Sequence, residues 1–341
     1  MKLLRSKDGS ADETREYEEL CRARLDHVVP VTQPLVLCSQ IHRSGGTLVS
    51  QLFDGHPECH AHPHELAIGY PRSRIWPQLD LGKPGTWFEI LHEKYADKHF
   101  RDGYRKPAQK SSDADPELFP FLMPPHLQRR IFDACVAGRK IERDRDVIDA
   151  YFTSYFNAWL DNHNLYTGPK KAVTAFAPRM NSKAASIEAL FTVYPDGHLI
   201  SLVREPRAWY NSARSQKATN VEVDDAIFRW RLSAQATIDA AKTYGDRVVV
   251  LTYEDLVGDT EGVMRHLADR IGLSWSDVLL EPTFNGRPIR ANSSDRVQQH
   301  GVLRDRTTAY KDALDPETIA RVDELAGDLY EQARERSLAR A

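Results

Sequence analysis

The chain has 341 residues, of which 41% are hydrophobic and 28% are charged, and its formal net charge is −3. This length and composition predict a folded protein with one substantial core, built as one elaborated domain or as two. The small net charge excludes a long-range attraction to nucleic acid or to anionic membranes. A site for an anion therefore needs positively charged side chains close to it.

The first thirty residues are charged and unlike a signal peptide, and no apolar run approaches the roughly 18 residues of a membrane span. We therefore expect a cytoplasmic protein without a membrane span. The four cysteines include no Cys-x-x-Cys pair, which predicts reduced thiols rather than a disulfide framework. Residues 1–33 are expected to form an N-terminal extension, with a peripheral helix over residues 12–26.

Residues 35–48 predict a buried strand, a turn of small residues and a helix that begins near Thr47. Such a turn binds phosphate because its backbone N–H groups converge and the helix N-terminus adds a positive dipole. Arg43 adds a cation. The turn lacks the Gly-Lys-Ser/Thr ending of a Walker A loop, which disfavours an ordinary site for splitting ATP or GTP. The residues of this predicted site are Arg43, Ser44, Gly45, Gly46, Thr47 and Leu48.

Residues 56–65 hold four histidines and one cysteine. In an extended segment His60, His62 and His64 would share one face, and zinc accepts such ligands. No standard zinc spacing accompanies them, so we interpret these histidines as solvated or bonded to local turns and keep zinc as the alternative.

Residues 70–125 are rich in proline, glycine and aromatic side chains, and we expect an acceptor-binding insertion over residues 70–170. The large apolar side chains of this stretch are Trp76, Trp87, Phe88, Phe119, Phe121 and Met123. The helical periodicity of residues 144–162 predicts a core helix, and residues 172–176 predict a strand that joins the sheet.

A second strand, turn and helix are predicted over residues 198–212, with Arg204 at the strand end and Ser212 two helical turns later. Ligands of open α/β sheets gather at the carboxyl ends of the strands. Arg43 and Arg204 at two strand ends therefore predict a site for a molecule with two separated anionic groups.

These patterns resemble the sulfotransferases that use 3′-phosphoadenosine 5′-phosphosulfate. Residues 43–48 are similar to the family's 5′-phosphosulfate loop, and residues 202–212 are similar to its 3′-phosphate motif, an Arg and a Ser eight positions apart. Residues 247–257 resemble the strand and Tyr-Glu-Asp-Leu turn that follow in the family. The resemblance covers a little under half of the chain, residues 35–65 and 171–292.

The resemblance implies an α/β fold, a P-loop-like three-layer sandwich whose mainly parallel sheet is flanked by helices. It implies 3′-phosphoadenosine 5′-phosphosulfate as cofactor, adenosine 3′,5′-bisphosphate as product, and no required metal. A loop over residues 285–310 would cover the nucleotide, and a C-terminal helix would occupy residues 311–341. Besides residues 43–48, the cofactor-binding residues that it implies are Arg204, Ser212, Tyr253, Asn292 and Ser293.

Two positions depart from the family's pattern. Gly46 stands where the family usually has Thr or Ser, and residues 175–179 keep the proline of the family's Lys-x-Pro sequence but not its lysine. Arg179 or Lys183 is the candidate for the missing charge.

The resemblance also implies an in-line transfer of a sulfuryl group to a hydroxyl or an amine of a small-molecule, lipid or carbohydrate acceptor. Arg43 would meet the charge that develops on the leaving phosphate. Glu65 is the first candidate for the base, with His62 and His64 as alternatives. A small-molecule kinase, a non-catalytic nucleotide-binding protein and a homodimer remain open.

Overall fold

A computed structural model describes residues 11–68, 75–105, 117–214, 222–291 and 299–340. Five parallel strands form the central sheet, in the order β2-β3-β1-β4-β5. Their bounds are β1 Leu35–Cys38, β2 Cys59–Glu65, β3 Ala172–Phe176, β4 His198–Val203 and β5 Val248–Thr252. A short antiparallel pair, β6 Thr283–Phe284 and β7 Arg287–Pro288, lies outside this sheet.

The central strands are almost continuously apolar because helices cover both faces of the sheet. In β1, Leu35 and Leu37 belong to one hydrophobic cluster, whereas Val36 and Cys38 belong to a second. This alternation follows from the two-residue period of a strand, which sends successive side chains to opposite faces. The predicted three-layer α/β sandwich is confirmed.

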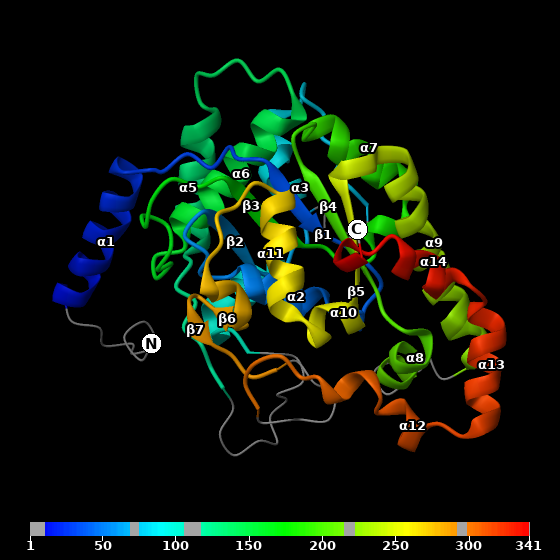
Figure 1. The fold of residues 1–341 in the computed structure, drawn as a ribbon. Helices are drawn as coiled ribbons and strands as arrows, with labels where there is room; N and C mark the ends of the chain where they lie inside the picture. The colour runs from blue at the N-terminus through cyan, green and yellow to red at the C-terminus, as the bar shows by residue number, and fades with distance from the viewer. Residues whose placement is uncertain (1–10, 69–74, 106–116, 215–221, 292–298, 341) are drawn as a thin grey trace.

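One face of the sheet packs against α2 Gly46–Phe53 and α11 Thr260–Arg270, which lie in front of the strands in Figure 1. The other face packs against α3 Trp87–Leu91, α5 Pro125–Val136, α6 Asp144–Ala158 and α7 Ala184–Val193. A third cluster joins α8 Pro206–Arg214 and α9 Val223–Tyr244 to the C-terminal helices. The remaining helices are α1 Ala11–Asp26, α4 Lys94–Asp102 and α10 Tyr253–Gly258.

The aromatic residues of the expected acceptor-binding insertion are core residues. All six large apolar side chains named above for this segment are buried in the same cluster as α5 and α6. Their abundance reflects packing between these helices and the sheet. The acceptor-binding role of residues 70–170 stays a prediction.

The expected single C-terminal helix is three helices, α12 Tyr310–Ala313, α13 Pro316–Ala326 and α14 Leu329–Glu335. Asp315 caps the start of α13 by accepting a hydrogen bond from the Thr318 N–H, and Gly327 at a φ of 58° ends it. These two local signals divide the segment. No helix among the described residues has both the length and the apolar character needed to cross a membrane.

Candidate active site

The predicted site residues come together at the carboxyl edge of the sheet. Glu65 ends β2, the loop of residues 39–45 follows β1, Arg204 follows β4, and Tyr253 follows β5. Because the strands are parallel and ordered β2-β3-β1-β4-β5, these groups are arrayed along one edge in that sequence. The two strand-end arginines are therefore neighbours in space, as the sequence predicts.

The loop before α2 has the backbone of an anion site. Arg43 has a φ of 70° and Gly45, the N-cap of α2, has a φ of 98° with no side-chain cap. The indole of Trp209 donates to the His42 carbonyl over 2.8 Å, and Arg204 donates to the Arg43 carbonyl over 3.0 Å. With these carbonyl groups engaged, the uncapped N–H groups at the start of α2 remain to meet an anion.

Arg43 and Ser212 are directly bonded. The Arg43 Nε donates to the Ser212 hydroxyl over 3.0 Å. Arg204 packs on the Tyr253 ring, with 4.4 Å between its Cζ and the ring centroid, and burial lowers the pKa of Arg204. Arginine nevertheless keeps its proton at neutral pH. The residues predicted to bind the 5′-phosphate and the 3′-phosphate thus belong to one connected cationic network.

Arg306 is a third arginine of this network. Its carbonyl accepts a hydrogen bond from Arg204 Nη2 over 2.8 Å. Burial raises the pKa of Tyr253, and the positive charges of Arg204, Arg306 and Arg43 oppose that rise. The sequence analysis did not single out Arg306. Arg306 lies 102 positions after Arg204, and no local sequence pattern connects two residues so far apart.

Neither candidate replacement for the missing lysine is buried. Arg179 follows β3 with a φ of 67°, and its backbone N–H donates to the Gln40 carbonyl over 2.9 Å. Lys183 is exposed beyond the next turn.

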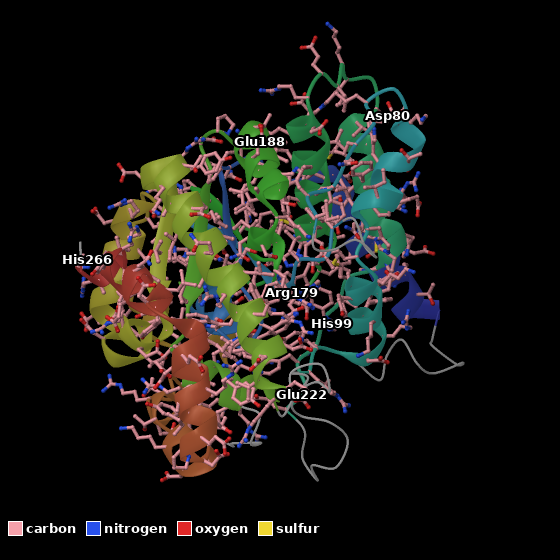
Figure 2. All side chains as sticks on the ribbon, turned by 90° about the vertical axis from the view of Figure 1, so that its right-hand side faces the viewer. Asp80, His99, Arg179, Glu188, Glu222 and His266 are labelled. Carbon is pink, nitrogen blue, oxygen red and sulfur yellow. The ribbon has the colours of Figure 1, made fainter. Side chains whose placement is uncertain are left out.

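Asn292 and Ser293, which the resemblance adds to the nucleotide site, lie outside the described residues. Figure 2 places Arg179 toward the middle of the molecule, whereas Asp80 and His266 lie at its periphery.

Glu65 reaches the sheet edge through an irregular strand. Ala61 pairs with Thr174 and Glu65 pairs with Phe176, so four steps along β2 match two steps along β3. Pro63 lies in this bulge and is tolerated because β2 is an edge strand. Glu65 is exposed at the strand end.

The bulge turns His62 and His64 into a buried polar cluster. His62 Nε2 lies 3.0 Å from a carboxylate oxygen of Glu93, a fully buried residue that also accepts from the Tyr151 hydroxyl. The His62 Nδ1 lies 2.9 Å from the His64 carbonyl. The charge of His62 holds the pKa of Glu93 at about 2 against the effect of burial. Both ring nitrogens of His62 therefore face oxygen atoms, one of the His64 carbonyl and one of the Glu93 carboxylate with which the ring pairs.

His64 is neutral within the same cluster. Burial lowers its pKa to about 3. Its Nδ1 lies 2.9 Å from the Glu65 carbonyl, and its Nε2 lies 2.8 Å from the Tyr155 hydroxyl, so Nδ1 donates and Nε2 accepts. The hydrogen bond from His64 Nδ1 to the Glu65 carbonyl fixes the backbone of Glu65.

Among the described residues, this cluster is also the group whose side chains could bind a metal ion. Single ligand atoms of His62, His64 and Glu93 all lie within 4.8 Å of one another, and two histidines with a glutamate can bind zinc. The ring nitrogens are, however, already used in hydrogen bonds to Glu93, Tyr155 and backbone carbonyls. A metal would have to displace protons from these bonds, so the geometry fits a hydrogen-bonded cluster better than a metal site.

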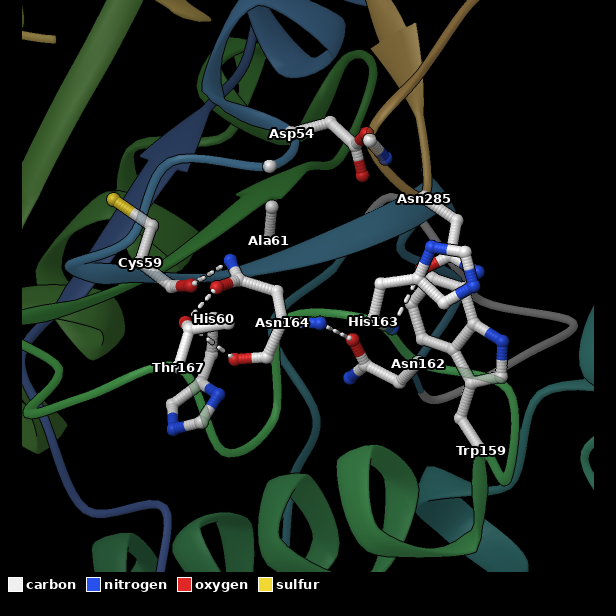
Figure 3. A pocket seen from close by; sticks show the side chains of 12 residues that line it. Asp54, Cys59, His60, Ala61, Trp159, Asn162, His163, Asn164, Thr167 and Asn285 are labelled. Atoms are coloured by element: carbon white, nitrogen blue, oxygen red, sulfur yellow. Dashed lines mark hydrogen bonds between the residues drawn. The ribbon is translucent and has the colours of Figure 1, made fainter.

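A small cavity of about 120 Å³ lies at the amino end of β2 (Figure 3), and no residue of the loop 39–45 lines it. Asp54, which follows α2, lines it, and the Asp54 carboxylate accepts from the Thr283 hydroxyl over 2.6 Å and from the Gly286 N–H over 2.8 Å. Burial raises the pKa of Asp54. These bonds anchor the turn between α2 and β2 to the β6-β7 pair, which supports a structural role.

Comparisons with known proteins identify relatives of this chain. The profile of the sulfotransferase family matches residues 41–277. The protein-tyrosine sulfotransferase A of Caenorhabditis elegans is 23% identical over 296 residues, which is 84% of this chain and 62% of that protein. This chain therefore spans about 62% of the length of that relative.

Solved sulfotransferase structures are also similar. The sulfotransferase domain of the Synechococcus PCC 7002 olefin synthase is 18% identical with a TM-score of 0.49, over 89% of this chain and 97% of the domain. A sulfotransferase from Alicyclobacillus acidocaldarius is 13% identical with a TM-score of 0.38, over 87% of this chain and 96% of that one. Since the family profile matches well over half of the chain, the chain belongs to the sulfotransferase family.

Proposed function

We propose that this protein transfers a sulfuryl group from 3′-phosphoadenosine 5′-phosphosulfate to a hydroxyl of an acceptor. The observation that carries the proposal is the order of groups along the sheet edge. Arg204 follows β4, the uncapped N-terminus of α2 follows β1, and Glu65 ends β2. In-line displacement needs a base on the side of the sulfur opposite the 5′-phosphate, and this order puts Glu65 on one side of the 5′-phosphate site and Arg204 on the other.

The residues fit the donor nucleotide by their chemistry. Arg204 and Ser212 would hold the 3′-phosphate, and Arg43 with residues 44–48 would hold the 5′-phosphosulfate. Ser44, buried to 1% exposure, has a hydroxyl oxygen without a hydrogen-bond partner among the described residues. A buried polar atom in a helix-start turn is an expected ligand contact. Tyr253 supports this site by packing against Arg204.

The nucleotide supplies the sulfuryl group and a phosphate leaving group. The acceptor oxygen bonds to sulfur, the bond from sulfur to the 5′-phosphate oxygen breaks with its electron pair remaining on the phosphate, and Glu65 takes the acceptor proton. Arg43 and the α2 amides would stabilise the charge that grows on the phosphate. No proton passes through His62 or His64, whose ring nitrogens are used inside the buried cluster.

The acceptor that we propose is a phenolic hydroxyl. Aromatic rings lie beside β2 near Glu65, since His64 is in ring contact with Tyr95 and His99, and His99 is in ring contact with Tyr104. A phenol, with a pKa near 10, gives up its proton to a carboxylate more readily than an aliphatic alcohol does. The C. elegans relative is named for tyrosine, a phenol, which also favours this acceptor class.

Calorimetric titration with adenosine 3′,5′-bisphosphate, beside ATP with and without Mg²⁺, tests the nucleotide. We expect the bisphosphate to bind and ATP to bind far more weakly, because only the bisphosphate carries the 3′-phosphate. Tight magnesium-dependent ATP binding would instead indicate a kinase.

Transfer of radiolabelled sulfate to a panel of phenols, sugars and lipid headgroups tests the reaction. We expect labelled phenols. Bisphosphate binding without label on any acceptor class would support a non-catalytic nucleotide-binding protein.

A further inference from the structure

Gln40 is a buried donor without an acceptor. It follows β1 by two residues and is 0% exposed. Its Oε1 accepts a hydrogen bond from the Cys38 thiol over 3.4 Å, which orients the amide. Its Nε2 has no hydrogen-bond partner in the described parts of the chain. Buried amide groups are almost always paired in folded proteins, so such an atom indicates a missing ligand.

The amide of Gln40 lies directly over the first residue of α2. A Cβ built on Gly46 would fall 1.9 Å from Gln40 Nε2 and 2.3 Å from the Phe176 ring. Only glycine leaves room for this arrangement. Ser44, the second buried residue with an unpartnered polar atom in this turn, is four positions away. Two such atoms therefore flank a helix start that has no side-chain cap.

Gln40 stands on the Glu65 side of the loop. It packs with Phe176 of β3, and Phe176 pairs with Glu65 of β2. Arg43 instead contacts Ser212 and Arg204 on the β4 side. In an in-line transfer the sulfur lies between the base and the 5′-phosphate. A donor on the Glu65 side of the loop therefore meets the transferring group, whereas donors on the β4 side meet the nucleotide phosphates.

We propose that Gln40 is a catalytic residue whose Nε2 donates a hydrogen bond to a non-bridging oxygen of the transferring sulfuryl group. The inference rests on the proposed function. Gln40 keeps both amide protons throughout and forms no covalent bond, so it acts only by hydrogen bonding. It also explains why Gly46 carries no side chain, since the amide of Gln40 fills that space.

Gln40→Met tests the inference, because methionine has a similar length and no N–H donor. Calorimetry compares the affinity for 3′-phosphoadenosine 5′-phosphosulfate with that for adenosine 3′,5′-bisphosphate, which lacks the sulfuryl group. We expect affinity for the first to fall roughly ten- to a hundredfold, the range of one hydrogen bond to a charged group. Affinity for the bisphosphate should stay as in the wild type. Gln128→Met, which alters another fully buried glutamine in α5, is the matched control and should leave both affinities unchanged.

An unchanged ratio of the two affinities in Gln40→Met would overturn the inference while leaving the proposed function intact. An equal loss for both nucleotides would also overturn it, because Gln40 would then serve the 5′-phosphate or the shape of the loop. A wild type that binds neither nucleotide would overturn the proposed function itself. If Gln40→Met does not fold, Gln40→Leu also removes the donor without adding a charge, and the same change in the affinity ratio is required of it.

Discussion

Arg43 donates a hydrogen bond from its Nε to the Ser212 hydroxyl across 3.0 Å, although 169 positions separate the two residues. The sequence predicts one of them for a 5′-phosphate and the other for a 3′-phosphate. Their bond means that the loop before α2 and the last turn of α8 are linked before any nucleotide binds. A ligand with both phosphates would have to compete with this bond or use it to orient the two groups.

Ser212→Ala should weaken the binding of adenosine 3′,5′-bisphosphate by roughly two- to tenfold, the effect of one ordinary hydrogen bond. The substitution removes only the hydroxyl and leaves α8 intact. Calorimetry measures the affinity, with adenosine 5′-phosphosulfate, which lacks the 3′-phosphate, as the control ligand. Equal losses for both nucleotides would remove Ser212 from the 3′-phosphate site.

Arg43→Ala should lower turnover by on the order of 10²–10³, as the loss of a donor to developing negative charge does. Arg43→Lys should retain part of the rate, because it keeps a positive charge. Saturation kinetics with a labelled acceptor separate the maximal rate from the affinity. A normal maximal rate with a weaker affinity would confine Arg43 to ground-state binding.

Glu65→Gln should lower turnover by roughly 10²–10⁴, because the amide cannot accept the acceptor proton. Affinity for adenosine 3′,5′-bisphosphate should not change. The matched control is Glu58→Gln, which makes the same change in the turn before β2, where Glu58 pairs with Lys171. Near-normal turnover in Glu65→Gln would return the base assignment to another residue near the end of β2.

Glu93→Gln should destabilise the fold by about 3–5 kcal/mol at neutral pH, because it removes one partner of the buried His62–Glu93 pair. Urea unfolding measures the loss. The double variant Glu93→Gln, His62→Gln removes the other partner as well and should recover part of that loss. If both variants unfolded at the same urea concentration, the two residues would not act as a pair.

His60→Phe should flatten the acid side of the stability profile. Burial lowers the pKa of His60 to about 3, and its Nε2 has no hydrogen-bond partner in the described chain. The folded protein keeps His60 neutral, whereas the unfolded chain protonates it below a pKa near 6.5. The stability that His60 contributes is therefore full above pH 6.5 and is lost as the pH falls toward 3.

Between about pH 6 and pH 4 the free energy of unfolding of the wild type should fall relative to that of His60→Phe by about 1.4 kcal/mol per pH unit. Urea unfolding at several pH values checks this. Phenylalanine keeps the ring contact that His60 makes with Phe156, whose centroid lies 5.0 Å away. Parallel profiles for the two proteins would show that His60 does not titrate on unfolding.

The sequence by itself determined the strands and the chemistry at their ends. Apolar runs bounded by turn residues predicted strands where β1, β3 and β4 lie, because a strand covered on both faces must be apolar throughout, and the predicted limits of β3 are those of the structure. The small residues of 44–46 and the eight-residue spacing of Arg204 and Ser212 are local patterns. Local patterns can be read without knowing what packs against them.

The tertiary structure alone decided which side chains face each other. Glu93 lies in a short turn between α3 and α4. Its role as the partner of a buried histidine is visible only from the His62 ring nitrogen 3.0 Å away. Gln40 and Phe176 explain Gly46 because β1 and β3 are adjacent, a pairing between segments far apart in the chain. Such contacts depend on strand order and on side-chain volume, and neither leaves a periodic signal in the sequence.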